Sequence, residues 1–164
     1  MPQRLATDGL AGRLPTLGPG RLSRLVAATA HDSARWSDLV RYDPISRWYC
    51  RLERADDYEV WLLSWLPGQR TGFHDHGASS GAFVVTLGAL TERGVVTGQH
   101  QDSARTITKG AVRAFGPDYV HDVRNDAVEP AVSVHAYSPP LTSMRRFELA
   151  PDGLLRVTAD DRSW

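Results

Sequence analysis

The stretch from Gly68 to Gly88, GQRTGFHDHGASSGAFVVTLG, places two histidines two residues apart between segments that are typical of β-strands. Because side chains alternate between the two faces of a strand, His74 and His76 point to the same side. Two imidazoles on one face can bind a single metal ion. Glycines that favour turns stand on both sides of the pair, with Gly68 before it and Gly81 and Gly88 after it. The stretch therefore predicts a metal site carried on a sheet.

A second stretch, GAVRAFGPDYVHDVRN, begins at Gly110 and contains one more histidine in a strand-like segment. The two stretches resemble the first and second motifs of the cupin superfamily, with Gly110, His121 and Asn125 standing as in the second motif. Pro117 is one place off the usual proline, and Asp118 stands where a glycine is usual. The resemblance supplies His121 as a third metal ligand.

The ligand set implied by this resemblance consists of histidines only. Many cupins add a glutamate after the histidine pair, but Gly81 occupies the corresponding place, and Glu92 lies too far along the chain to replace it. Three neutral imidazoles leave a divalent ion with its full positive charge and with open positions, which favours anionic ligands. In terms of ligand softness, a neutral imidazole set with vacant positions suits ferrous iron and a thiolate substrate. The spacing alone does not exclude zinc, nickel, copper or manganese.

Composition is that of one globular unit. The 164 residues are 41% hydrophobic and contain 19 basic and 19 acidic side chains. We expect a single cupin domain over residues 1–164, with a helical segment at about 20–42 and a β core at about 48–158. Balanced charge argues against a nucleic-acid partner, and no apolar run is long enough for a membrane span. The only cysteine, Cys50, excludes an internal disulfide and fits a reducing compartment, so we expect the cytoplasm.

Two segments before residue 44 have the periodicity of amphipathic helices that pack against the outside of a sheet. The first covers residues 21–30, and the second begins after Asp32 or Ser33 and ends at Asp43-Pro44. From residue 48 the pattern changes to short β-rich runs separated by turn residues. We predict strands at 48–54, 58–66, 70–76, 82–88, 90–97, 104–108, 112–115, 119–125, 130–138, 143–149 and 153–158. Because no helix intervenes, the sheets should be mainly antiparallel, and a double-stranded jelly roll fits the cupin resemblance.

Three segments are more specific: RLERADDYEVWLLSWLPGQRTGFHDHG from Arg51, YVHDVRN, and SVHAYSPP. Together they resemble the cysteine dioxygenase family over about residues 40–142. The resemblance implies that His74, His76 and His121 hold a non-haem ferrous iron, to which cysteine binds through its thiolate and amine while dioxygen takes the remaining position. The implied product is cysteine sulfinate.

The resemblance also implies a substrate-binding arginine. Arg51, in the segment WYCRL, matches the residue that pairs with the substrate carboxylate, which a guanidinium can do through two parallel hydrogen bonds. Tyr49 and Trp65 are candidates for the wall of the same pocket, although core packing is an alternative role for Trp65.

Alternation places Ser133, His135 and Tyr137 on one face of a strand, where they match the catalytic Ser-His-Tyr relay of the family. A tyrosine hydroxyl near the iron can donate to bound oxygen or substrate, while the histidine orients the hydroxyl and the serine fixes the imidazole. The resemblance further implies a cis peptide before Pro139. Animal members have a cysteine in place of Gly81, cross-linked to the relay tyrosine, and this chain cannot form that thioether.

Two alternatives stay open at this point. The first is a dioxygenase of another small thiol such as 3-mercaptopropionate, whose relatives keep the three histidines but usually have glutamine in place of Arg51. The second is a non-catalytic metal-binding cupin, which has no need of Arg51 or Tyr137. Arg51 therefore favours cysteine as the substrate.

Overall fold

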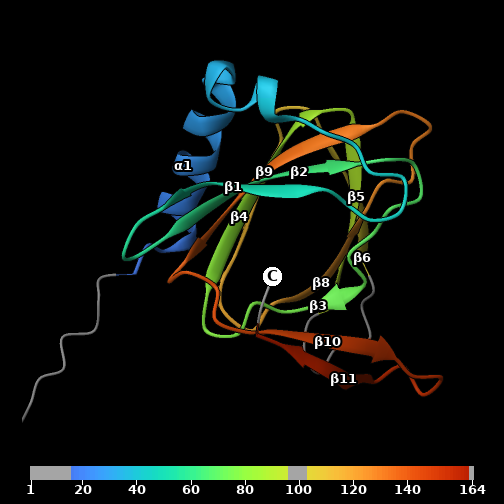
Figure 1. Cartoon of the computed structure of the whole chain (residues 1–164). Coiled ribbons are helices and arrows are strands. Elements are labelled where there is room, and N and C mark those ends of the chain that lie inside the picture. The colour runs from blue at the N-terminus through green and yellow to red at the C-terminus, as the bar shows by residue number, and fades with distance from the viewer. Residues whose placement is uncertain (1–15, 96–102, 163–164) are drawn as a thin grey trace, which may run out of the picture.

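The computed structural model of the chain describes residues 16–95 and 103–162. Within these residues it contains one α-helix, α1 (Pro19–His31), two single turns of 3-10 helix, and eleven strands (Figure 1). In chain order the strands are β1 (Tyr49–Arg54), β2 (Glu59–Trp65), β3 (Phe73–His74), β4 (Ser80–Leu87), β5 (Ala89–Val95), β6 (Ser103–Thr108), β7 (Val112–Phe115), β8 (Val120–Arg124), β9 (Ala131–Ser138), β10 (Met144–Leu149) and β11 (Leu155–Asp161).

The strands form two facing sheets. One has five strands in the order β1-β2-β9-β4-β7, and the other has six in the order β11-β10-β3-β8-β5-β6. Every pairing between named strands is antiparallel, as the sequence predicted. Each predicted strand has a counterpart, and the last two residues of the run predicted at 90–97 lie outside the described residues. This is the double-stranded architecture that the sequence led us to expect.

The central strands of the five-stranded sheet are buried on both faces. On β9 all eight residues are buried. One set of alternate side chains, including Val132, Val134 and Ala136, packs beneath α1. The other set includes Tyr137 and points into the space between the two sheets. Polar residues on that inner face are therefore held inside the protein, where they need partners.

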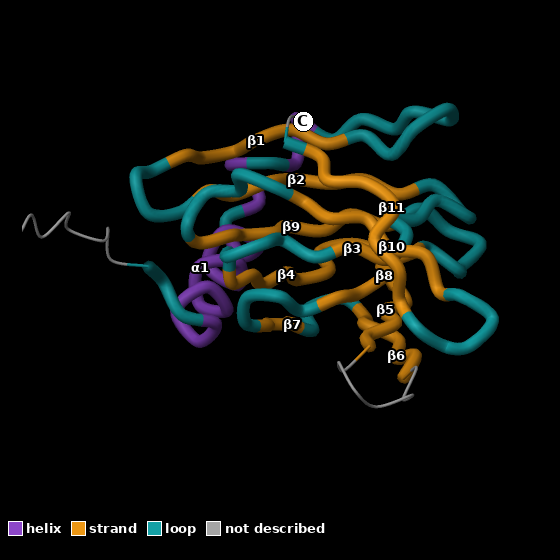
Figure 2. Tube along the Cα trace, turned by 90° about the horizontal axis from the view of Figure 1, so that it is seen from below, coloured by secondary structure: helices purple, strands orange, loops and turns teal. Residues whose placement is uncertain are grey.

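Helix α1 covers the outer face of the five-stranded sheet, where it contacts β4, β7 and β9 (Figure 2). Leu22 and Val26 are fully buried there, which confirms that the first predicted helix packs against a sheet. The helix begins after Gly18 with Pro19 in its first turn, where the missing N–H costs nothing. Among the described residues, no helix has the length and apolar character required to cross a bilayer.

The second predicted helix takes a different form. In its place are two turns of 3-10 helix, Ser33–Arg35 and Ser37–Leu39. The residue between them, Trp36, has φ −141°, which interrupts helical geometry. This change of direction lets Trp36 and Val40 pack against the cluster beneath α1. Tertiary packing thus overrides a helical periodicity that is only a few residues long.

Two backbone features agree with the motifs. The Ser138–Pro139 peptide is cis, as the family resemblance implies. Asp118, which stands where a glycine is usual in the second cupin motif, has φ 59°. A positive φ is the conformation for which glycine is the default residue, and aspartate is one of the few others that tolerate it.

Candidate metal centre

Three buried imidazoles converge between the two sheets. His74 on β3 and His121 on β8 are directly opposed in the antiparallel register, so both side chains project from the same face of the six-stranded sheet. His76 follows β3 by two residues and joins them. One nitrogen from each ring can be chosen so that all three lie within 4.8 Å of one another. Among the described residues, this is the group of histidine, cysteine or acidic side chains that could hold a metal ion.

The hydrogen bonds around the three rings select their free nitrogens. His74 Nδ1 lies 2.9 Å from the carbonyl oxygen of Gly72, and His121 Nδ1 lies 3.0 Å from Glu92 Oε1. Each ring is thereby fixed by an N–H donated from Nδ1, which leaves Nε2 as a free ligand atom. His76 is 2% exposed and neither of its nitrogens makes a hydrogen bond. Since buried polar atoms nearly always have partners, the free nitrogens fit a metal ion.

The electrostatic environment keeps the imidazoles of His74 and His76 in the neutral form that binds metals. Burial lowers the pKa of His74 well below its usual value, and the neighbouring His121 adds to this effect. Burial likewise lowers the pKa of His76, with further contributions from the other two rings. A neutral imidazole keeps its ligand lone pair, so a metal ion does not have to displace a proton from these two rings.

Glu92 supports the three imidazoles, although it lies too far from the histidine pair in the sequence for the motif to indicate it. On β5, Gly94 is the register partner of His121, and Glu92 is the diagonal neighbour on the same face. Its carboxylate is fully buried and accepts hydrogen bonds from His121 and, at 2.6 Å, from Arg113 Nε. Although burial alone raises it, these contacts hold the pKa of Glu92 below its usual value. The sequence contained one signal, an acidic residue at an inward position of an alternating strand.

Asp75, between the two histidines of the first motif, fixes the turn that carries His76. Its side chain is fully buried, and Oδ1 accepts hydrogen bonds from the backbone N–H groups of Gly77 and Arg145, both at 3.2 Å. The Arg145 guanidinium donates to Oδ2, with Nε at 2.8 Å. These bonds tie the segment after β3 to β10, so the position of His76 is set by the sheet rather than by a free loop.

The three predicted relay residues lie in a row on the inner face of β9. Ser133 Oγ is 2.8 Å from His135 Nε2, and His135 Nδ1 is 3.3 Å from the hydroxyl of Tyr137. The Tyr137 ring stacks on His76, with ring centroids 4.7 Å apart. Burial raises the pKa of Tyr137 far above its ordinary value, so the phenol keeps its proton. The row therefore ends in a hydroxyl donor beside the three imidazoles.

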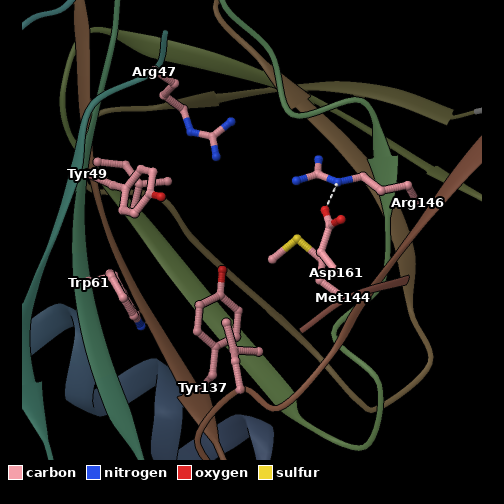
Figure 3. Close-up of a pocket in the computed structure, with 9 residues that line it drawn as sticks. Arg47, Tyr49, Trp61, Tyr137, Met144, Arg146 and Asp161 are labelled. Atoms are coloured by element: carbon pink, nitrogen blue, oxygen red, sulfur yellow. Dashed lines mark hydrogen bonds and ion pairs between the residues drawn. The ribbon is translucent and has the colours of Figure 1, made fainter. Parts of the chain in front are cut away.

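Two adjoining cavities lie next to the imidazoles. The inner one has a volume of about 40 Å³ and is lined by His74, His121, His135 and Tyr137. The outer one, of about 110 Å³, opens to the surface between the two sheets. Figure 3 shows the side chains that surround the outer cavity. Its described lining residues are Arg47, Tyr49, Trp61, Leu63, Tyr137, Leu141, Met144, Arg146 and Asp161.

Of the three predicted substrate-binding residues, only one lines a cavity next to the imidazoles. Tyr49 lines the outer cavity, while Arg51 and Trp65 belong to the lining of neither cavity. The Arg51 side chain is 44% exposed and lies 3.7 Å from Glu59 Oε2. Trp65 is fully buried in the core and donates its indole N–H to Ser133 Oγ at 2.9 Å. The residue that reaches both cavities from the segment before β1 is Arg47, which the sequence analysis did not single out.

One known protein family matches the part of the chain that contains all of these motifs. The family description cysteine dioxygenase type I matches residues 20–150, which includes the three histidines and the relay. This match is longer than the resemblance noted over residues 40–142, because it also takes in α1 at one end and β10 at the other.

Solved structures confirm the fold. A protein from Thermus thermophilus is 21% identical, with a TM-score of 0.56 over 63% of this chain and 93% of that chain. An RmlC-like cupin protein from Desulfovibrio desulfuricans is 22% identical, with a TM-score of 0.53 over 62% and 91%. A Klebsiella pneumoniae protein with a double-stranded β-helix domain is 20% identical, with a TM-score of 0.55 over 63% and 80%. The predicted cupin double-stranded β-helix is therefore confirmed.

Proposed function

Because this chain belongs to the cysteine dioxygenase type I family, we propose that it is a non-haem iron thiol dioxygenase that oxidises cysteine with dioxygen to cysteine sulfinate. The observation that carries the proposal is the position of a tyrosine hydroxyl beside three converging imidazoles. In this reaction both oxygen atoms of dioxygen become attached to the sulfur. The thiol itself supplies the four electrons, so no further reductant is required.

The ligand set supports iron and a thiolate. His74, His76 and His121 would hold a ferrous ion through neutral nitrogens and contribute no negative charge. When bound there, ferrous iron supplies both the Lewis acidity that favours a thiolate over a thiol and the redox capacity that dioxygen chemistry requires. Glu92 and the carbonyl of Gly72 orient two of the rings for this task.

Tyr137 is the proposed catalytic hydroxyl. It faces both cavities, and its raised pKa keeps it a hydrogen-bond donor rather than an anion. His135 and Ser133 act through it, because they set the direction in which its proton points. A single donor aimed at developing negative charge in a dry site typically contributes about 10²–10³ in rate.

The cavities favour a small thiol. The outer and inner cavities have volumes of about 110 and 40 Å³, a space that favours a ligand of the size of an amino acid or a short mercapto acid. Cysteine and 3-mercaptopropionate both meet the size limit, so size supports the reaction class and not a choice between the two.

Metal analysis followed by oxygen consumption tests the proposal. Protein purified without added metal should contain iron, and the iron protein should consume one dioxygen per thiol when given cysteine. The panel should include 3-mercaptopropionate and cysteamine. Faster turnover of 3-mercaptopropionate than of cysteine would make 3-mercaptopropionate the assigned substrate. Stoichiometric iron without oxygen uptake for any thiol would favour a non-catalytic cupin.

A further inference from the structure

The last strand, β11, brings a carboxylate to the outer cavity. Asp161 is the final residue of this strand, where the antiparallel register places it opposite Met144 on β10. Met144 lines both cavities, and Asp161 lines the outer one. In Figure 3 the carboxylate of Asp161 faces the cavity beside the side chains of Met144 and Arg146. Among the described residues that line either cavity, Asp161 is the acidic one.

One oxygen of this carboxylate is available to a ligand. Arg146 Nε donates to Asp161 Oδ2 at 2.8 Å, and Nη1 of the same guanidinium donates to the carbonyl oxygen of Thr71 at 2.9 Å. Within the described part of the chain, Asp161 Oδ1 accepts no hydrogen bond. A carboxylate has about four acceptor positions, and the Asp161 side chain is 42% exposed. The protein therefore leaves acceptor capacity for a donor in the cavity.

The charges around the outer cavity indicate what kind of donor this carboxylate favours. The described lining carries two guanidinium groups, those of Arg47 and Arg146, together with Asp161. Two guanidinium groups alone would repel a ligand ammonium, because like charges that are close together and partly removed from water are unfavourable. The Asp161 carboxylate offsets this repulsion and attracts the ammonium. The cavity therefore accommodates an amino group, which cysteine has and 3-mercaptopropionate lacks.

We propose that Asp161 accepts a hydrogen bond from the amino group of the thiol substrate and thereby selects cysteine over 3-mercaptopropionate. The inference rests on the proposed function and narrows its substrate class to aminothiols. The family match covers residues 20–150, so Asp161 lies outside the part of the chain on which the family assignment depends. An amine that binds a metal ion keeps two N–H groups, so a contact with Oδ1 is compatible with the ligation that the family resemblance implies.

A purely structural role for Asp161 predicts a different pattern of ligand binding. If Asp161 served only to hold Arg146, its loss would act on ligands through the released guanidinium, and the presence of an amino group would make no difference. If Asp161 contacts the amino group, its loss acts on aminothiols and spares a thiol without an amine. Comparison of thiols with and without an amine therefore separates the two roles.

Binding measured without oxygen tests the proposal separately from turnover. Calorimetric titrations of the iron-loaded protein under anaerobic conditions use L-cysteine, cysteamine and 3-mercaptopropionate as probes. Asp161→Asn keeps the size of the side chain and removes its charge, whereas Asp161→Ala removes both oxygens. Asp160→Asn is the matched control, because Asp160 precedes Asp161 on β11, is 39% exposed, pairs with Arg162 at 3.0 Å and belongs to the lining of neither cavity.

Asp161→Asn should lower the affinity for cysteine and cysteamine, relative to that for 3-mercaptopropionate, by about threefold to tenfold, as expected for a partly exposed charge pair. Asp161→Ala should show the same selectivity with a larger loss, and Asp160→Asn should leave all three affinities within about twofold of the wild type. If the alanine variant does not fold, the asparagine variant decides the question. Unchanged relative affinities in the Asp161 variants overturn the assignment, as does an equal selective loss in Asp160→Asn.

The two proposals fail in different ways. Oxygen uptake by the wild-type protein decides whether it is a dioxygenase, and the anaerobic titrations decide whether Asp161 recognises an amino group. Aminothiols that bind through Asp161 without oxygen uptake would overturn the dioxygenase and retain the recognition site. Oxygen uptake together with unchanged relative affinities in the Asp161 variants would retain the dioxygenase and overturn the recognition site.

Discussion

Trp65 donates its indole N–H to the hydroxyl oxygen of Ser133 at 2.9 Å, and this one bond sets the direction of the relay on β9. An indole nitrogen can only donate, so the Ser133 proton is free to be given to His135 Nε2. Burial lowers the pKa of His135 well below its usual value, so the ring is neutral and carries its single proton on Nδ1. That proton is donated to the Tyr137 oxygen, which leaves the phenol proton available to the cavity.

The direction of the relay predicts how its members depend on one another. Tyr137→Phe should lower kcat by about 10²-fold and leave iron content unchanged, because it removes one donor beside the reacting atoms. Ser133→Ala should lower kcat by about tenfold, since His135 can then adopt the other tautomer. In the Tyr137→Phe background the Ser133→Ala change should have almost no further effect. Additive losses in the double variant would show that Ser133 acts independently of Tyr137.

The ligand assignment gives a second prediction. His121→Ala removes one of three nitrogens from a centre whose other two ligands lie on or just after β3, so iron in the purified protein should fall below one tenth of the wild-type content. His31→Ala is the matched control, because His31 is exposed in the last turn of α1. Iron content and oxygen uptake are measured on the same samples. Full iron and activity in His121→Ala would assign the third ligand to another residue.

The strands could be predicted because their signal is local. Along a strand of the five-stranded sheet, side chains point alternately to the face covered by α1 and to the face turned toward the other sheet. The sequence of segments such as 131–138 shows this alternation. The second helix could not be predicted correctly. Its periodicity was produced by Trp36, Leu39 and Val40. Trp36 and Val40 flank the second 3-10 turn and pack on the cluster beneath α1, whereas Leu39 is exposed. A pattern of apolar residues indicates which side chains can be buried, and it does not report how the backbone places them.

The pair His74 and His76 could be predicted for the same reason, since their spacing places them on one face, and the cupin resemblance supplied His121. Glu92 and Arg47 could not. Glu92 reaches His121, 29 residues further along the chain, through a diagonal contact that depends on the register between β5 and β8. Arg47 lines the cavity while Arg51 lies beside Glu59, and no local pattern reports that Glu59 and Arg51 meet. Sequence reasoning therefore identified the three histidines that converge and missed Glu92 and Arg47 beside them.

The contact between Glu92 and His121 predicts a change in metal affinity without loss of a ligand. Glu92→Gln keeps the size and one acceptor oxygen but removes the negative charge that polarises the His121 ring. The affinity for ferrous or zinc ion should fall about 10–100-fold. Chelator competition measures the constant, with the exposed Glu129→Gln as the control. Unchanged affinity in Glu92→Gln would limit the role of Glu92 to its ion pair with Arg113.

The last prediction concerns Gly81, because a neighbouring ring occupies the space that a side chain at this position would need. A Cβ at this position would lie 2.4 Å from two atoms of the Phe115 ring and 3.2 Å from Tyr137 Cδ1. Gly81 is the register partner of both residues, on β7 and on β9. Phe115 in turn stacks on His76, with ring centroids 5.2 Å apart. The ring therefore occupies the space in which the cysteine of animal family members would have to stand.

Gly81→Cys should consequently destabilise the protein by about 1–3 kcal/mol and should not form the thioether to Tyr137. The free energy of unfolding in urea measures the first effect, and intact mass measures the second, since the cross-link removes two hydrogen atoms. Gly116→Cys is the control, because a Cβ there meets nothing within 4 Å. In a Phe115→Ala background the Gly81→Cys change should cost less than it does in the wild type if the clash with the ring is the cause. A stable single variant with the cross-linked mass would show that Phe115 moves aside readily, and that the glycine is not required by packing.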